Sequence, residues 1–140
     1  VYKLTQIGDQ PTMKVSENIT KMTLPGIKHI YRLREKEDGC FYADGIELQD
    51  ADKPAVIYHP YQPDKNTPVD QYQYEDLVCK VMEKGKTNHS LPTVEESTQY
   101  CQERIQFLPD ESRRFENPHI YKVGIGEKLM TLRNNIKDTL

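Results

Sequence analysis

The hydrophobic pattern of this chain changes its period at Pro92, and that change constrains the fold more than any other feature. Before Pro92, apolar residues tend to alternate with polar ones, which is typical of strands that are buried on one face. After Pro92, apolar residues recur every three to four positions, which is typical of amphipathic helices. Strands first and helices last predict an α+β fold, in which an antiparallel sheet of short strands and hairpins carries two C-terminal helices packed on one side.

Three hairpins are predicted before Pro92, and they pair residues 2–7 with 12–15, 27–35 with 40–48, and 77–82 with 87–91. The second hairpin has the clearest turn, because Asp38-Gly39 lies between its strands. An Asp-Gly pair supplies the positive φ angles that a tight hairpin turn requires.

Residues 49–76 are rich in proline and aspartate and are expected to be mostly loop. Proline has no backbone N–H, so a segment with four prolines does not sustain a regular ladder of hydrogen bonds. Residues 55–58 (Ala-Val-Ile-Tyr) are the one strand expected there. Because prolines and loops lie on both sides of that strand, we expect it at the edge of the sheet.

Two helices are predicted after Pro92, over residues 94–108 and 127–137. Thr93 and Glu96 have the spacing of a capping box, in which each side chain accepts a hydrogen bond from the other residue's backbone. The second helix follows Gly126, which is an acceptable N-cap, and it carries basic residues towards its C-terminal end.

The length of 140 residues fits one domain, so we expect residues 1–140 to form a single α+β module. The module divides into strand pairs at 1–48, a loop at 49–76, and a hairpin with two helices at 77–140. The chain begins at Val1, inside a strand-like segment, and this indicates a piece of a longer protein; removal of an initiator methionine is the alternative.

Composition excludes several classes of function. The net charge of −3 is spread without long blocks of one sign, which disfavours a nucleic-acid-binding surface. No apolar run approaches the ~18 residues of a membrane-spanning helix, and no apolar signal segment is present, so we expect a cytoplasmic protein. The three cysteines show no C-x-x-C spacing, which argues against a disulfide framework or a zinc site.

Three lysines surround a Pro-Gly turn at residues 25–26 and are the candidate site residues. Lys14 and Lys21 precede the turn and Lys28 follows it, with serine and threonine hydroxyls between them. Cations and hydroxyl donors suit a phosphate or a pyrophosphate, and glycine lets backbone approach an anion closely. The alternative is a solvated loop with ordinary surface lysines.

No catalytic motif is present. His59 lies in a proline-stiffened loop beside two tyrosines, and Asp64 is a possible carboxylate to orient it. An independent hydrolase centred on His59 is therefore one hypothesis for the function. The sequence contains no G-x-G-x-x-G, G-x-x-x-x-G-K-[ST] or H-E-x-x-H arrangement. We therefore predict no catalytic residue and no metal ligand in this chain.

Residues 14–28 match the pattern K-x-[ST]-E-x-x-x-K-x-T-x-P-G-x-K. This segment resembles the one that follows the barrel in nicotinate phosphoribosyltransferases. Further matches follow in the same order, and they are Leu91-Pro92-Thr93, Leu108-Pro109, Arg113-Arg114, Asn117-Pro118, Tyr121-Lys122-Val123 and Leu132-Arg133. The family usually has serine at the position of Gly126, where this chain departs from the pattern.

The resemblance implies that the chain is the C-terminal domain of an enzyme of NAD salvage. Such enzymes join nicotinate to the phosphoribosyl group of phosphoribosyl pyrophosphate, with Mg²⁺ and with ATP hydrolysis through a phosphohistidine. The barrel that carries this histidine would lie upstream of Val1. The resemblance therefore implies that this part binds no cofactor itself, is structural rather than catalytic, and has the barrel as its partner, within a homodimer.

The resemblance also implies a role for the lysines. In related nicotinamide-using transferases a similar segment approaches the ligand phosphates, so Lys14 and Lys21 are expected to stabilise departing pyrophosphate, with Lys28 as a weaker candidate. The alternative function is a stand-alone interaction module, which binds an anionic metabolite or a protein partner through the same three lysines.

Overall fold

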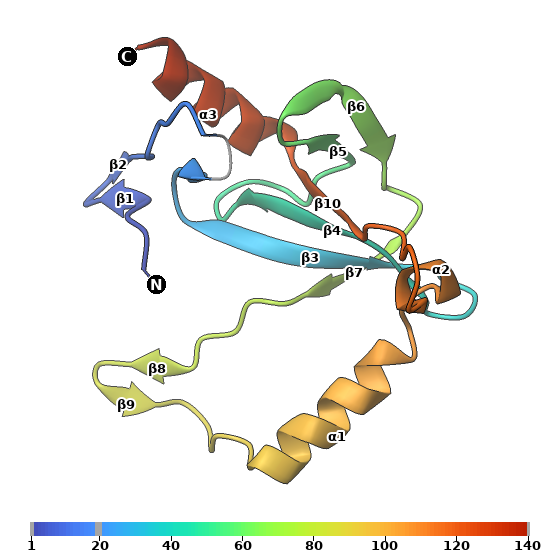
Figure 1. Cartoon of the computed structure of the whole chain (residues 1–140). Coiled ribbons are helices and arrows are strands. Elements are labelled where there is room, and N and C mark those ends of the chain that lie inside the picture. Colours follow the sequence, from blue (N-terminus) through green and yellow to red (C-terminus); the bar gives the residue numbers. More distant parts are fainter. Residues whose placement is uncertain (1, 19–20, 140) are drawn as a thin grey trace.

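The computed structural model describes residues 2–18 and 21–139. Within them, six strands form the main sheet in the order β6-β5-β10-β4-β3-β7 (Figure 1). These strands are β3 (Lys28–Arg34), β4 (Phe41–Leu48), β5 (Val56–His59), β6 (Gln62–Pro68), β7 (Gln73–Asp76) and β10 (Lys122–Ile125). Two small hairpins lie outside it, β1 (Gln6–Ile7) with β2 (Gln10–Pro11) and β8 (Met82–Glu83) with β9 (Lys86–Thr87). The helices are α1 (Val94–Ile105), α2 (Asp110–Arg113) and α3 (Glu127–Asp138).

The predicted α+β class is confirmed, but the main sheet is mixed rather than purely antiparallel. Strand β10 runs parallel to β4, from the pair Lys122↔Ala43 to the pair Ile125↔Ile46. A parallel neighbour needs a long connection, which the chain provides by passing through α1 and α2 before it returns. This last strand inserts into the middle of the sheet and was not predicted.

The hairpin predicted from residues 27–35 and 40–48 is confirmed as β3 and β4. Its register runs from Lys28↔Leu48 to Arg34↔Phe41, and Gly39 in the turn has φ +72°. Along β4, buried and half-buried residues alternate strictly, as the period of two requires when one face covers the core.

The expectation that residues 49–76 are mostly loop is wrong. Three strands of the main sheet, β5, β6 and β7, lie there. Strand β5 is also not an edge strand, because β6 covers it on one side and β10 on the other. The edge is β6, which contains Pro63 and Pro68; an edge strand tolerates prolines because its outer N–H groups need no partner.

The other two predicted hairpins are much shorter than expected, and the second strand of the first one is Gln10–Pro11 instead of the predicted residues 12–15. Strands β1 and β2 pair over two residues each, and so do β8 and β9. Residues 77–81 form no strand, although their apolar and polar residues alternate. Alternation stabilises a strand only where a neighbouring strand and a core are present, and residues 79–83 are exposed.

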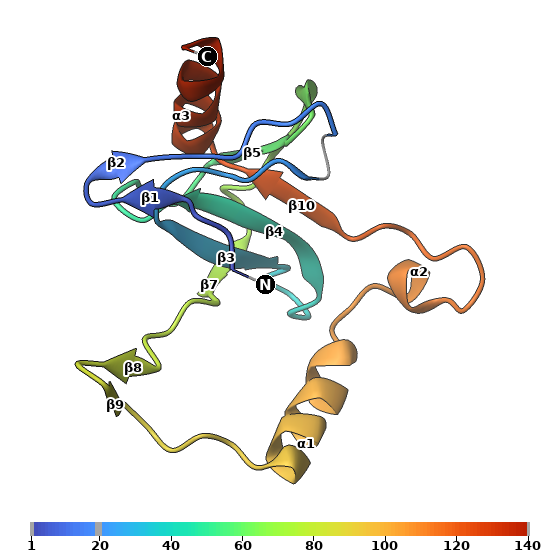
Figure 2. The ribbon, with the colours of Figure 1, turned by 60° about the vertical axis from the view of Figure 1, so that its left-hand side comes forward.

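Of the two predicted helices, α3 packs on the sheet as expected and α1 does not. Helix α3 buries Leu129 and Arg133 and contacts β4 and β5. Helix α1 buries no residue and, with β8 and β9, extends away from the sheet (Figures 1 and 2). It is attached near its C-terminal end, where Arg104 donates to Glu75 at 2.6 and 2.7 Å. Its apolar stripe is therefore uncovered in this structure, which corrects the prediction that both helices cover the sheet.

The predicted capping box of α1 is confirmed. The Glu96 N–H donates to Thr93 Oγ1 at 3.2 Å, and the Thr93 N–H donates to Glu96 Oε2 at 2.7 Å. This reciprocal pair satisfies two of the free N–H groups at the helix start, so local sequence is sufficient to begin a helix that has little tertiary support.

The core lies under the centre of the sheet, where Leu33, Ala43, Ile57 and Val69 are buried against one another. Three tyrosines pack around it, Tyr42, Tyr72 and Tyr74. No helix among the described residues is long and apolar enough to cross a membrane.

The raised pKa of Tyr72 predicts that the folded protein loses stability at alkaline pH. Burial and a hydrogen bond with Tyr42 raise the pKa of Tyr72 to about 12, whereas an unfolded tyrosine titrates near pH 10. Between these values the unfolded chain has lost the proton that the folded chain retains, so the free energy of unfolding should fall as the pH rises. Urea denaturation across this range should show a smaller fall for Tyr72→Phe than for the parent. The fully exposed Tyr2 gives the control Tyr2→Phe, and equal slopes for the two variants would contradict the assignment.

Candidate functional site

Two of the three predicted lysines, Lys14 and Lys21, line one hollow of about 550 Å³ near the N-terminus. The lining residues are Tyr2, Lys3, Leu4, Thr12, Met13, Lys14, Lys21 and Thr23. The structure thus brings together two residues that are seven positions apart, and adds Lys3, which the sequence analysis missed. Nothing in the sequence around Lys3 connects it with residue 14, because their proximity depends on the fold of the N-terminal segment.

Hydrogen bonds link the segments that form the two sides of the hollow. The Lys14 N–H donates to Thr23 Oγ1 at 2.8 Å, and the Thr23 N–H donates to the Lys14 carbonyl at 3.3 Å. Thr5 joins the segments through its carbonyl, which accepts from Thr12 and Gly26 N–H groups at 2.9 and 2.8 Å. Thr23 is buried, so the backbone beneath the lysines is fixed while the lysine side chains stay exposed.

Lys28 does not line this hollow. Its ammonium donates to the carbonyls of Leu24 at 3.0 Å, of Pro25 at 3.3 Å and of Gly26. Burial lowers the pKa of Lys28, and its three N–H donors match the three carbonyls of the turn. Lys28 therefore stabilises the Pro-Gly turn from within and is not oriented towards a ligand at the hollow.

Gly26 is required at this turn for two reasons. Its φ is +76°, a conformation that residues with a Cβ rarely adopt. A Cβ at this position would also lie 2.9 Å from the Leu48 side chain of β4. The glycine therefore allows the loop with Lys14 and Lys21 to lie directly against the end of the sheet.

The chemistry of the hollow favours an anion. Its described lining includes three ammonium groups and no carboxylate, histidine or cysteine. Lysines bind phosphate and carboxylate groups by charge and by hydrogen bonds, but they supply no nucleophile or general base in their charged form. The hollow can therefore hold a phosphate or pyrophosphate, and its charged lysines suit binding better than nucleophilic attack.

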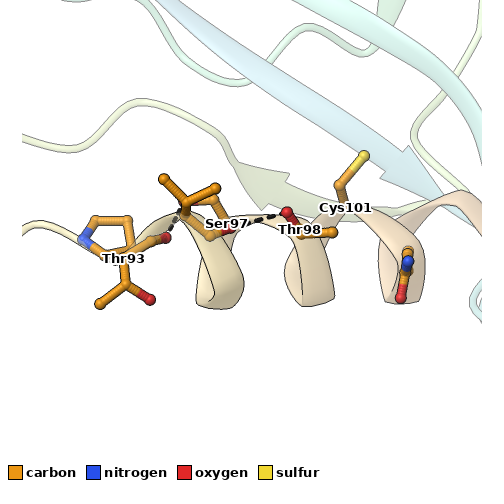
Figure 3. A pocket seen from close by; sticks show the side chains of 7 residues that line it. Thr93, Ser97, Thr98 and Cys101 are labelled. Carbon is orange, nitrogen blue, oxygen red and sulfur yellow. Dashed lines mark hydrogen bonds between the residues drawn. The ribbon is translucent and has the colours of Figure 1, made fainter.

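A second hollow, of about 420 Å³, lies along α1 (Figure 3). Its hydroxyl groups are already engaged, because Ser97 Oγ donates to the Thr93 carbonyl and Thr98 Oγ1 donates to the Val94 carbonyl, both at 2.8 Å. Cys101 is the remaining reactive side chain there, and no histidine or charged residue lines the hollow to activate it. This surface has no catalytic arrangement.

His59 lines a third hollow, of about 630 Å³, between the β5–β6 hairpin and residues 120–124. Its Nδ1 accepts a hydrogen bond from the Tyr61 N–H at 3.2 Å, and among the described residues no ion pair joins it to Asp64. The described residues also contain no group of three His, Cys, Asp or Glu placed to hold a metal ion. The hypothesis of a hydrolase centred on His59 therefore has no support from this geometry.

Comparison with known proteins identifies relatives whose matches extend over nearly all of this chain. A profile of the family described as Nicotinate phosphoribosyltransferase C-terminal domain matches residues 27–133. Nicotinate phosphoribosyltransferase of Dictyostelium discoideum is 31% identical over 147 residues and covers 97% of this chain. That of Homo sapiens is 33% identical over 141 residues, also with 97% coverage, and that of Bacillus subtilis is 30% identical over 135 residues with 91% coverage.

A solved structure agrees with these relatives. The crystal structure of human Nicotinic Acid Phosphoribosyltransferase superposes with a TM-score of 0.82 at 30% identity, and the match covers 98% of this chain. The chain spans about a quarter of the length of the relatives, 25% of the Dictyostelium protein and 26% of the human one. Lys14 and Lys21 precede the region that the family profile matches, and the matches to relatives and to the solved structure extend over nearly the whole chain.

Proposed function

Because this chain belongs to the nicotinate phosphoribosyltransferase family, as its C-terminal domain, we propose that it completes an enzyme that makes nicotinate mononucleotide from nicotinate and phosphoribosyl pyrophosphate. In this proposal the reaction serves NAD salvage in the cytoplasm, and the chemistry takes place in a barrel outside the chain described above. The domain itself supplies cations to the substrate phosphates and does not act on a covalent bond.

The hollow with Lys3, Lys14 and Lys21 is the observation that carries the proposal. Three ammonium groups without a neighbouring carboxylate attract the pyrophosphate group of phosphoribosyl pyrophosphate. Negative charge increases on pyrophosphate as its bond to the sugar breaks, and positioned cations stabilise that charge in the transition state. Binding and leaving-group stabilisation are therefore the role that we assign to these lysines.

The cofactors belong elsewhere in the proposed enzyme. Mg²⁺ prefers oxygen ligands from carboxylates and phosphates, and the hollow has no carboxylate. The described lining of this hollow therefore does not fit a protein-held Mg²⁺ site, and we assign the Mg²⁺ and ATP sites, together with the phosphohistidine, to the barrel. We also propose that the complete enzyme is a homodimer.

Exposed apolar side chains favour a domain of a larger enzyme over a stand-alone interaction module. Large apolar residues are exposed along the arm formed by β8, β9 and α1 and on the chain after it; they include Val81, Met82, Leu91, Val94, Tyr100, Phe115 and Ile120. Monomeric proteins rarely leave so many apolar side chains uncovered, whereas a domain boundary does.

The lysine assignment predicts a specific kinetic change in the complete enzyme. Lys14→Gln and Lys21→Gln should each lower kcat/KM for phosphoribosyl pyrophosphate by about tenfold, since losing one charge-assisted contact costs on the order of 1.4 kcal/mol. The KM for nicotinate should stay unchanged. Lys36→Gln, in the exposed β3–β4 turn, is the matched control and should leave both constants at the parent values. If both lysine variants kept the kcat/KM of the parent, the hollow would not be part of the active site.

A further inference from the structure

Arg133 on α3 is a buried cation that pairs with no carboxylate of the described residues. Its exposed fraction is 8%, and no aspartate or glutamate in that part of the chain forms an ion pair with it. Three half-buried arginines are paired differently: Arg32 in β3 binds Asp44 at 3.0 Å, while Arg34 in β3 and Arg104 in α1 both contact Glu75, at 3.5 and 2.6 Å. A buried charge without a counterion is costly, so an anion placed beside Arg133 would stabilise it.

The hydrogen bonds that Arg133 donates to described residues all go to neutral oxygens. Its Nη1 donates to the Pro60 carbonyl, and its Nε and Nη2 donate to Asn134 Oδ1 at 3.3 and 3.1 Å. Burial lowers the pKa of Arg133, and the neighbouring Tyr61 opposes this effect only in part. A guanidinium has five N–H donors, so these three contacts leave two of them for another acceptor.

Arg133 lines a hollow of about 260 Å³ between α3 and the turn that joins β5 to β6. The lining residues are Met22, Pro60, Tyr61, Pro63, Arg133, Asn134 and Lys137. Lys137 lies four residues after Arg133, which places the two cations on the same face of the helix. None of the described residues in the lining is acidic, so the charges of Arg133 and Lys137 are both available to attract an anion in the hollow.

We propose that this hollow is a second anion site, which binds a phosphate group through the Arg133 guanidinium with Lys137 at its rim. The planar guanidinium donates to two oxygens of one phosphate, and a phosphate supplies the charge that the buried arginine lacks. The site is separate from the lysine hollow, because the two share no lining residue. It goes beyond the proposed function, and the phosphate belongs either to inorganic phosphate or to a small phosphate monoester.

The test is a ¹H–¹⁵N spectrum of the arginine Nε–H groups in the 140-residue chain, titrated with inorganic phosphate at constant ionic strength. The Arg133 resonance should shift and saturate, while that of Arg32, which is paired with Asp44, should stay constant. Lys137→Gln should weaken binding by about tenfold, the effect of one lost charge-assisted contact. Lys128→Gln, at an exposed position of the same helix, is the control and should bind as the parent does.

Two further measurements test whether this site is independent of the lysine hollow and whether its ligand is inorganic phosphate or a phosphate monoester. The double variant Lys14→Gln/Lys21→Gln should leave the Arg133 titration unchanged, so the lysine assignment can fail without affecting this result. Tighter binding of glycerol phosphate than of inorganic phosphate would identify a monoester, and the reverse order would identify the free anion. The proposal is overturned if Arg133 shows no saturable shift, if chloride reproduces the shift, or if Lys137→Gln binds as the parent does.

Discussion

Replacing Glu47 by alanine is expected to lower the free energy of unfolding by about 2–4 kcal/mol, because its carboxylate caps helix α3 from strand β4. Glu47 is 3% exposed. Its Oε1 accepts from the Leu129 N–H at 2.8 Å, and its Oε2 accepts from the Lys128 N–H at 3.2 Å. These are free N–H groups of the first helical turn, and the anion also interacts favourably with the helix dipole.

Gly126 leaves the space that the Glu47 carboxylate occupies at the start of α3. It is the N-cap of α3 and makes no side-chain cap hydrogen bond. A Cβ at residue 126 would lie 2.1 Å from Glu47 Oε2 and 3.0 Å from Pro54 Cβ. Serine is a good N-cap in most helices, but here its side chain would enter the space that the Glu47 carboxylate occupies. Gly126→Ser should therefore destabilise the parent by about 1–3 kcal/mol, the usual cost of overpacking.

A double-mutant cycle separates this explanation from two independent losses. In the Glu47→Ala background the space is empty, and the introduced serine can cap the helix with its own hydroxyl. We expect the cost of Gly126→Ser to fall by at least about 1 kcal/mol in that background, which is the coupling typical of residues in contact. Urea denaturation of the parent, both single variants and the double variant measures the coupling. Additive costs would show that Glu47 and Gly126 do not share a cap.

Leu33→Ala is the second large effect, with an expected loss of about 2–5 kcal/mol of unfolding free energy. Leu33 is 0% exposed and lies in the core cluster with Ala43, Ile57 and Val69, so alanine would leave a cavity under the centre of the sheet. Leu91→Ala is the same substitution at a residue that is 69% exposed, and should change stability by less than about 0.5 kcal/mol. Denaturation midpoints that differ little between the two variants would contradict the placement of the core.

The elements that the sequence predicted well depend on neighbours in the chain. The β3–β4 hairpin follows from alternation on both sides of Asp38-Gly39, and the start of α1 follows from the spacing of Thr93 and Glu96. Strand β10 depends on partners far away in the chain, since Lys122 pairs with Ala43. Its four residues show no period long enough to be recognised, so only the assembled sheet identifies it.

The prediction for residues 49–76 was wrong for a similar reason, which concerns their prolines. The absence of an N–H is unfavourable in a central strand but not on the outer side of an edge strand, and sequence does not tell which position a segment will take. Strand β6 became the edge with its prolines included, and this allowed β5 to lie inside the sheet.

The candidate site could be predicted only in part. Lys14 and Lys21 follow from a local motif, and the structure places both at one hollow. Lys28 belongs to the same motif, but its ammonium is bound by the carbonyls of the turn, which depends on how the chain folds back. Arg133 was identified from the sequence only as part of the Leu132-Arg133 match, because its burial away from acidic residues depends on which residues are near it in space.

The most direct test of the account is to capture the native protein with an antibody to this chain, determine its mass, and assay it for nicotinate mononucleotide synthesis. The chain spans about a quarter of the length of its relatives, so we predict a protein about four times larger than these 140 residues, with that activity. A native protein the size of this chain, without the activity, would contradict the account and favour an independent binding module.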